Sequence, residues 1–294
     1  MGDTEWPFLG TEALRNGSVS ERGLRRGYDR IYRDVYLARG TDMTAESRAV
    51  AAWLWSGRQA TLGGLSAAAL HGSKWIDAEL PAELFRRNGK KANGILIHRD
   101  ELLADEATVL HDINVTTPAR TAFDLGRRGR RIAAVIRLDA LANATGLAPS
   151  RIWPLVDRHS GVRGLVQLRE VLDLMDGGAE SPQETRTRLV LVDAGLPRPR
   201  TQVRVGRWRV DMGYEDFKVG LEYDGPQHWE DPEIRARDIE KYADLSARGW
   251  VIIRVGAELL RYRQRVVVAR TCEALLQAGA AWPAIGRILG KSVA

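Results

Sequence analysis

The chain has 294 residues, 44% of them hydrophobic, which predicts a globular protein of two or three domains. Its 44 lysines and arginines against 38 acidic residues give a net charge of +6, which favours a polyanion such as nucleic acid as partner. A single cysteine, Cys272, excludes a disulfide framework and a thiolate zinc site. No apolar run reaches the roughly 20 residues of a membrane helix, and MGDTEWPF is acidic where a signal peptide is basic. We therefore expect a cytoplasmic protein without a membrane partner.

The residue pattern of segment 1–60 predicts two short helices followed by a two-stranded wing. The helices are expected at 8–16 and 20–27, with Ser20 as the N-cap of the second. Alternating apolar residues predict a strand pair within 29–39. Helix, helix, wing is the order of a winged helix.

Five arginines gather on the second predicted helix and just after it. They are Arg22, Arg25, Arg26, Arg30 and Arg33. Such a density of positive charge suits phosphate contact at a DNA groove. Arginine clusters are equally common on ordinary solvated surfaces. Both interpretations stay open, and we predict that segment 1–60 is a winged-helix DNA-binding domain.

A resemblance to a known family begins here, in TEALRNGSVSERGLRRGYDRIYRDVYLARG. This segment is similar to the N-terminal winged helix of the AbiE-type antitoxins of abortive-infection toxin–antitoxin systems. In that family a short basic helix precedes a strand ending in a Val-Tyr pair, here Val35 and Tyr36. Family members usually have glycine before the pair, and this chain has Asp34. The resemblance implies two partners, DNA and a cognate toxin.

Segment 61–176 is predicted to be a mixed and then helical middle region. After a helix at 44–57, we expect Ser66 to cap an alanine-rich helix that ends at His71, with strands at 83–86 and 95–99. We interpret His71 as a helix-end histidine bonded to backbone rather than as a catalyst, because no second histidine or carboxylate motif adjoins it.

A well-formed helix start follows at Thr117, the N-cap, with Pro118 at the first helical position. The pattern Thr-x-x-Arg-Thr-x-x-Asp, here Thr117, Arg120, Thr121 and Asp124, resembles the middle segment of AbiE-type antitoxin-like proteins. Arg120 and Asp124 are four residues apart on a predicted helix, so we interpret them as a surface ion pair.

The densest basic cluster of the chain follows that helix. Its members are Arg127, Arg128, Arg130 and Arg131. Contact with a polyanion and a solvated helix junction are both compatible with this cluster. Helices are then expected over 131–145 and within 150–176, where Gly161 and Gly164 lie between two of them.

The third segment, 177–294, begins at the predicted linker Gly177-Gly178. Ser181, Pro182 and Glu184 form a capping-box pattern that opens a helix. Three strands, a helix and a fourth strand are then expected at 197–205, 207–212, 217–224, 231–249 and 250–255, and a final amphipathic helix at 264–279. The order αβββαβ makes the fold class of the whole chain α+β, a mixed α/β protein.

The third of these strands is expected to separate a core face from a polar face. Alternation places Phe217, Val219, Leu221 and Tyr223 on the first, and Lys218, Gly220, Glu222 and Asp224 on the second. Asp211 ends the preceding strand and is expected beside Glu222, where a hard divalent cation would relieve the repulsion of the two carboxylates. The small Gly220 is expected to leave open space beside Glu222.

A second resemblance rests on three blocks, ESPQETRTRLVLVDAGLP, VDMGYEDFKVGLEYDGPQHW and RARDIEKYADLSARGWVIIRV. They are similar to the endonuclease-like domains related to very-short-patch-repair endonucleases, within the PD-(D/E)XK superfamily. The resemblance implies that Asp211 and Glu222 bind Mg²⁺ or Mn²⁺, with Glu184 as a further metal carboxylate, although its capping box explains that glutamate equally well.

The same resemblance assigns roles to the residues around this strand. Asp224 stands where many superfamily members have lysine, so the catalytic cation must come from Lys218, Lys241 or a second metal. Gln227 and His228 follow the acidic strand as in the family, where the histidine acts as general acid or base or contacts phosphate.

Two functions are therefore predicted. The leading hypothesis is a metal-dependent DNA endonuclease recruited by a basic winged helix, with Asp211, Glu222 and their cation hydrolysing a phosphodiester. The alternative is a DNA-binding transcriptional regulator, such as a type IV antitoxin, whose nuclease-like domain is inert.

Overall fold

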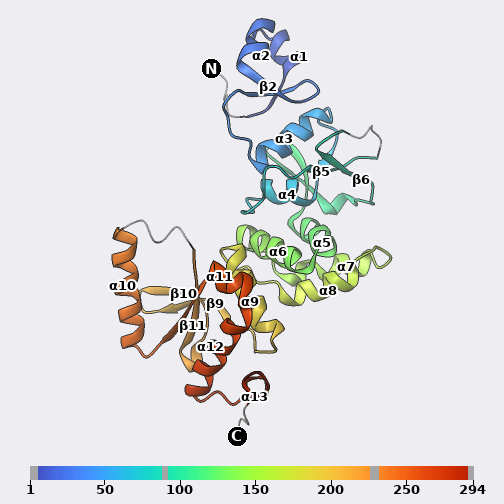
Figure 1. Ribbon diagram of the computed structural model, residues 1–294. Helices are drawn as coiled ribbons and strands as arrows, with labels where there is room; N and C mark the ends of the chain where they lie inside the picture. The colour runs from blue at the N-terminus through green and yellow to red at the C-terminus, as the bar shows by residue number, and fades with distance from the viewer. Residues whose placement is uncertain (1–5, 88–91, 226–231, 291–294) are drawn as a thin grey trace. The chain divides into compact units, whose positions relative to one another are not determined.

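The computed structural model describes residues 6–87, 92–225 and 232–290. Helices and three β-sheets share this described part, which confirms the predicted α+β class (Figure 1). The chain divides into two compact units, residues 1–177 and 178–294.

The first unit begins with two helices and a small antiparallel sheet. These elements are β1 (Phe8–Leu9), α1 (Gly10–Arg15), α2 (Glu21–Gly27), β2 (Tyr28–Tyr32) and β3 (Val35–Ala38). The sheet has the order β1-β3-β2. Ser20 caps α2 by accepting a hydrogen bond of 3.1 Å from the Gly23 amide. The predicted order of two helices followed by a wing is confirmed.

Asp34 forms the turn between β2 and β3. Its φ of 63° lies in the left-handed region, where aspartate is among the few non-glycine residues tolerated. Its carboxylate accepts hydrogen bonds from the Thr11 amide at 2.9 Å and from the Thr11 hydroxyl at 2.5 Å. Asp34 thus replaces the glycine usual at this position and also ties the wing to α1.

The next part of the first unit is built on a five-stranded sheet. Its elements are α3 (Ala45–Trp55), β4 (Thr61–Leu62), α4 (Gly64–Leu70), β5 (Ala82–Phe85), β6 (Ile95–His98), β7 (Ala107–Leu110) and β8 (Ile113–Thr116). The strand order is β6-β5-β4-β8-β7, with β5 and β6 parallel. The predicted strands at 83–86 and 95–99 correspond to β5 and β6, whose pairing was not predicted.

One hydrophobic cluster contains residues from both sides of residue 60. Val35 of the wing and Ala49 of α3 belong to it together with Leu62, Leu84 and Val115 of the sheet, and none of these five side chains is exposed. Each fully buried leucine contributes about 1.5–3 kcal/mol relative to an exposed one. The boundary at residue 60 stays a prediction.

Two expectations for α4 have different outcomes. Ser66 is not its cap, because the helix already begins at Gly64 and the Ser66 hydroxyl instead accepts a hydrogen bond of 2.8 Å from the Glu83 amide. The prediction for His71 is confirmed: it ends α4, and its Nε2 lies 2.8 Å from the Thr116 carbonyl oxygen. Burial lowers the pKa of His71, which disfavours a charged state.

A helical part completes the first unit. Its helices are α5 (Pro118–Arg127), α6 (Arg131–Thr145), α7 (Trp153–Arg158) and α8 (Leu165–Leu174). Thr117 caps α5 as predicted. The break expected at Gly161 and Gly164 lies between α7 and α8, and the φ of Gly164 is 93°. A Cβ there would lie 2.2 Å from the Arg127 carbonyl oxygen, so close packing against α5 requires glycine.

The second unit has a four-stranded sheet with the order β12-β11-β10-β9. Its elements are α9 (Pro182–Asp193), β9 (Arg200–Val205), β10 (Trp208–Tyr214), β11 (Val219–Asp224), α10 (Pro232–Ala247), β12 (Val251–Gly256), α11 (Ala257–Tyr262), α12 (Gln264–Gln277) and α13 (Pro283–Leu289). Strands β9, β10 and β11 are antiparallel, and β12 is parallel to β11. The predicted order αβββαβ is confirmed.

Helices cover both faces of this sheet (Figure 1). On one face Leu221 packs in a cluster with Leu191 of α9 and the fully buried Cys272 of α12, as predicted for this cysteine. On the other face Val210 packs with Leu245 of α10. Successive side chains of a strand point to opposite faces, so Glu222 lies on the α10 face.

Candidate functional site

The five arginines of the predicted DNA-binding surface are all exposed; we call them the basic α2 face. Arg22 and Arg26 lie one turn apart, on the side of α2 opposite the buried Leu24. Arg25 is paired with Glu21 at 3.0 Å, and in the described part of the chain the other four have no ion-pair partner. Unpaired guanidinium groups on a convex helix are available for phosphate.

The basic cluster that begins at the end of α5 differs from the basic α2 face, because most of its arginines have internal ion-pair partners. Arg127 and Arg128 both contact Asp100, Arg128 at 2.7 Å, and Arg131 lies 2.5 Å from Glu170. These three arginines form ion pairs with carboxylates of the same unit. The structure therefore favours the helix-junction interpretation for three of the four residues.

The Arg120–Asp124 pair is buried, which corrects the expectation of a surface ion pair. Arg120 Nε lies 2.9 Å from Asp124 Oδ2, and the two side chains are 1% and 0% exposed. The four-residue spacing was right, but the strands and helices packed around α5 remove this face of the helix from solvent.

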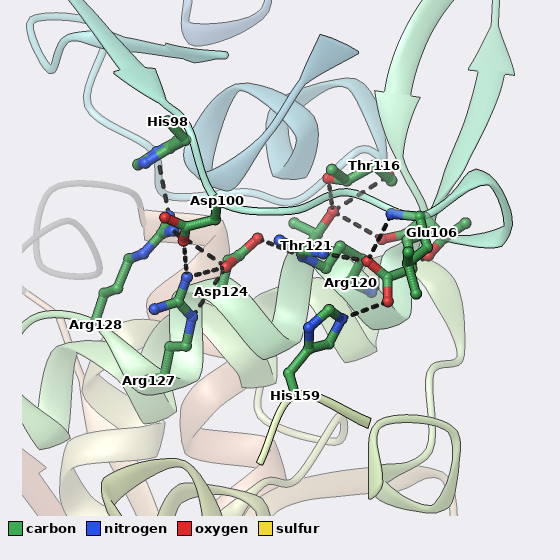
Figure 2. A network of polar contacts seen from close by, with 12 residues as sticks. His98, Asp100, Glu106, Thr116, Arg120, Thr121, Asp124, Arg127, Arg128 and His159 are labelled. Carbon is green, nitrogen blue, oxygen red and sulfur yellow. Dashed lines mark hydrogen bonds and ion pairs between the residues drawn. The ribbon is translucent and has the colours of Figure 1, made fainter. Parts of the chain in front are cut away.

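This pair belongs to a larger set of contacts that we call the buried polar network (Figure 2). The buried Glu106 is paired with Arg120, and its Oε1 lies 2.6 Å from His159 Nε2. At the other end, Asp124 accepts a hydrogen bond of 2.9 Å from Arg127 Nη2. The network therefore joins the segment before β7 to α5 and to the end of α7.

Electrostatics in the network favour the charged forms of its carboxylates. Burial raises the pKa of Glu106, but the hydrogen bond from His159 and the charge of Arg120 outweigh it, and the net shift is downward. The pKa of Asp100 is also lowered, because contacts with Arg127 and Arg128 outweigh its burial. Such mutual pairing is typical of a structural unit that fixes packing.

A second polar cluster lies in the second unit; we call it the carboxylate site. Its members are Glu184, Asp211, Glu222 and Asp224. The register pairs Met212 with Leu221, and its continuation places Asp211 opposite Glu222, as predicted. Asp211 Oδ2 accepts a hydrogen bond of 2.8 Å from the Tyr223 amide.

Glu184 reaches this site from the first turn of α9. Ser181 caps α9 as predicted, since its hydroxyl accepts a hydrogen bond of 3.2 Å from the Glu184 amide. The same hydroxyl donates a hydrogen bond of 2.8 Å to Glu184 Oε1, so the carboxylate contacts the side chain of the cap instead of completing a capping box through its amide. The other carboxylate oxygen accepts hydrogen bonds from the Glu180 amide and from Gln202 Nε2, at 2.9 and 3.2 Å. Burial is the main reason that the pKa of Glu184 is raised.

Glu222 is buried and has two partners on α10. Tyr242 donates a hydrogen bond of 2.7 Å to Oε2, and Lys241 Nζ lies 2.5 Å from Oε1. Among the described residues Oε1 accepts no hydrogen bond in addition to this ion pair. Burial and the charge of Glu222 raise the pKa of Tyr242, so its hydroxyl remains a donor.

Asp211 has the strongest electrostatic perturbation of the site. Burial and then the charge of Glu184 raise its pKa to about 7, and Glu222 acts in the same direction. Crowded carboxylates of this kind are what a divalent cation would stabilise. In the described conformation, however, no three His, Cys, Asp or Glu side chains of residues 6–87, 92–225 and 232–290 are grouped closely enough to hold a metal ion.

The predicted position of Lys218 is wrong. Lys218 follows a 3₁₀ turn, has a φ of 52° and precedes β11, so the alternation of the strand does not include it. Its Nζ donates a hydrogen bond of 3.2 Å to the Arg248 carbonyl oxygen. Four residues of extended chain, about 13 Å, separate Lys218 from Glu222.

Lys241 and Arg254 form ion pairs with two of the carboxylates, Glu222 and Asp224. Arg254 Nη2 lies 2.5 Å from Asp224 Oδ2, and its guanidinium lies 5.0 Å from the centre of the Tyr242 ring. Sequence reasoning considered Lys241 but missed Arg254. The sequence marks Arg254 only as a single charged residue within an apolar strand. This indicates a role in the carboxylate site only once β12 is known to pair with β11.

Two further expectations concern the neighbourhood of Glu222. Gly220 does not leave open space, because a Cβ there would lie 2.8 Å from side-chain carbons of both Ile252 and Val210. Gln227 and His228 lie outside the described residues, so their predicted roles stay predictions.

The raised pKa of Asp211 gives a prediction for stability. The group ionises at 3.8 when unperturbed and at about 7 in the folded protein, so the folded state binds more protons between these values. The stability that Asp211 contributes is therefore fully present below pH 3.8 and is lost as the pH rises through about 7. Asp211→Asn should flatten this dependence, measured by urea unfolding with hydrogen exchange of β10 and β11. The exposed Asp216→Asn is the control; an equal dependence in all three proteins would contradict the assignment.

A comparison with protein families matches the middle of the chain. Residues 60–174, the sheet and helices that contain the buried polar network, match the AbiEi antitoxin C-terminal domain. This supports the predicted resemblance of the middle region to AbiE-type antitoxins, and the matched segment lies within the first unit.

A longer similarity covers both units. The chain is 30% identical over 253 residues to an uncharacterized protein of Mycobacterium tuberculosis, found in two strains, and the alignment covers 83% of this chain and 91% of that protein. The chain belongs to the family of this mycobacterial protein. No solved structure matches it. Among the described residues, no helix is both long and apolar enough to cross a membrane.

Proposed function

We propose that this protein is a DNA-binding regulator of the antitoxin kind. The observation that carries the proposal is the match of residues 60–174 to an AbiEi antitoxin domain, which follows a segment of two helices and a small sheet with an exposed basic face. In this proposal the basic α2 face binds DNA, and the antitoxin-like domain contacts a cognate toxin. A cytoplasmic location, where both partners would be found, is part of the proposal.

The charges of the α2 face support DNA as the ligand. Arg22, Arg26, Arg30 and Arg33 are exposed and, within the described residues, unpaired. By contrast, three of the four arginines in the cluster at the end of α5 are paired internally. Arginine forms bidentate contacts with phosphate, and each neutralised phosphate releases counterions. Binding should therefore be strong at low salt and weaken steeply as salt increases.

The test is binding to the DNA upstream of the protein's own gene. We expect a specific complex in the presence of EDTA, because the α2 face needs no metal ion. Fluorescence anisotropy with the upstream fragment and with an unrelated fragment of equal length measures specificity. Equal affinity for both fragments across a salt series would contradict the regulator proposal.

A metal-dependent nuclease is a second candidate, favoured by one specific observation. Glu184, Asp211 and Glu222 project from α9, β10 and β11 of an αβββαβ domain, and the charge of the first raises the pKa of the second. We propose that these carboxylates hold Mg²⁺ or Mn²⁺, which when bound would activate water and stabilise charge on phosphate. Lys241 and Arg254 would then supply the positive charge that the usual lysine gives in related nucleases.

Glu222→Gln tests the metal site. At a Mg²⁺ concentration 100 times its Kd, binding should stabilise the wild-type protein by about 2.7 kcal/mol, and the variant should lose this gain because one charged ligand is removed. Thermal unfolding with and without Mg²⁺ measures the gain, and Glu215→Gln, at an exposed carboxylate, is the matched control. Nicking of plasmid DNA by the wild type but not by Glu222→Gln would extend metal binding to cleavage. An equal Mg²⁺ effect on all three proteins would place any cation elsewhere.

A further inference from the structure

We propose that a cavity in the antitoxin-like domain binds backbone phosphate of DNA, as a second contact beyond the basic α2 face. The cavity has a volume of about 670 Å³ and lies where β5 and β6 end. Because these two strands are parallel, their carboxyl ends meet at the same edge of the sheet. This brings Arg86 and Arg87, which follow β5, beside Arg99, which follows β6; we call the cavity the arginine pocket.

Its arginines are available to an external anion. Arg87 and Arg99 are exposed, and within the described residues none of the three has an ion-pair partner. Arg86 is half-buried, with its guanidinium 6.0 Å from the centre of the Trp55 ring, a contact that restricts its orientation. A preorganised guanidinium loses little conformational entropy when it binds phosphate.

The acidic residues nearby only partly offset this charge. Asp100 lines the cavity but contacts both Arg127 and Arg128. Glu83, below the rim, is paired with His98 at 2.7 Å. Glu101 is the remaining acidic residue of the lining, and three arginines exceed it in charge. The pocket therefore favours an anion.

The lining favours a phosphate from a nucleic acid backbone over a mononucleotide. A nucleotide site usually offers an aromatic or apolar surface to the base. The aromatic rings of this cavity belong to Phe85, which is 6% exposed, and to His98, whose side chain is 10% exposed, and they pack against each other with ring centres 5.2 Å apart. Phosphate recognition without base stacking is the pattern of backbone contact. This inference rests on the proposed DNA-binding function.

The experiment measures how DNA affinity depends on salt. Replacing Arg86, Arg87 and Arg99 together by glutamine should lower the slope of log affinity against log salt by about 1 for each phosphate that is no longer neutralised. A matched triple variant, Arg169→Gln with Arg263→Gln and Arg270→Gln, removes the same charge from exposed sites elsewhere and should leave the slope unchanged. Because Arg86 packs on Trp55, the double variant Arg87→Gln with Arg99→Gln is measured as well and should show the same direction of change.

Three other outcomes distinguish a failure of the arginine-pocket inference from a failure of the proposed DNA-binding function. An unchanged slope in both pocket variants, with DNA binding intact, would overturn the arginine pocket and leave the proposed function standing. Failure of the wild type to bind any DNA would overturn the proposed function itself. Saturable binding of a mononucleotide by the wild type, abolished in the pocket variants while their DNA slope stays unchanged, would show that the pocket takes a free phosphate compound instead.

Discussion

Replacing Arg22 and Arg26 together with alanine should weaken binding to the upstream DNA by about 100-fold at moderate salt. Both side chains are exposed on the side of α2 opposite Leu24, and within the described residues neither has an internal partner. Each charge-assisted hydrogen bond contributes about 1.5–3 kcal/mol, so the loss of two costs at least about 3 kcal/mol, or about 100-fold in affinity. Fluorescence anisotropy at several salt concentrations measures the effect.

Two controls make this result specific. Arg25→Ala should have a smaller effect, because Arg25 is already paired with Glu21. Glu222→Gln should have no effect on DNA affinity if the regulator proposal holds. If the double variant binds the fragment as tightly as the wild type, the basic α2 face is an ordinary solvated surface, which was the other interpretation of its arginines.

Local sequence signals predicted much of the fold. The N-caps Ser20, Thr117 and Ser181 each accept the hydrogen bond that their positions predict. The alternation in β11 correctly placed Val219 and Leu221 in the core. These predictions depended on contacts within a few residues, which a single sequence contains in full.

Some features that depend on contacts between distant segments of the chain were not predicted correctly. The spacing of Arg120 and Asp124 is the same for a surface pair and a buried pair, and only the packing around α5 decides between them. Arg254 became part of the carboxylate site through the register of β12 on β11. The predicted position of Lys218 in the strand was wrong for a local reason, because the backbone is left-handed at that residue and the strand begins after it.

The carboxylate site is compatible with both proposed functions. Lys241 and Arg254 neutralise Glu222 and Asp224 within the domain itself, so the fold needs no cation to relieve those two charges. Asp211 and Glu184 differ, because the hydrogen bonds that they accept within the described residues come from neutral donors. The choice between an inert and an active site therefore depends on whether a cation binds beside Asp211.

Arg120→Met should destabilise the first unit by about 3–5 kcal/mol, because it removes the buried cation that pairs with two buried carboxylates. Arg120 contacts Glu106 and Asp124, and all three side chains are at most 2% exposed. Its guanidinium also lies 5.1 Å from the centre of the Phe85 ring. Urea unfolding, with hydrogen exchange followed in α5, measures the change in the unit that contains the network.

The matched control is Arg39→Met, which breaks an ion pair with Asp29 whose two side chains are 57% and 58% exposed. Such a pair contributes about 0–1 kcal/mol, so this variant should unfold almost as the wild type does. Adding Asp124→Leu to Arg120→Met should cost less than the sum of the two single changes, because each single change already breaks the same Arg120–Asp124 ion pair. Strict additivity, or equal effects of Arg120→Met and Arg39→Met, would show that the buried polar network contributes no more than a surface pair.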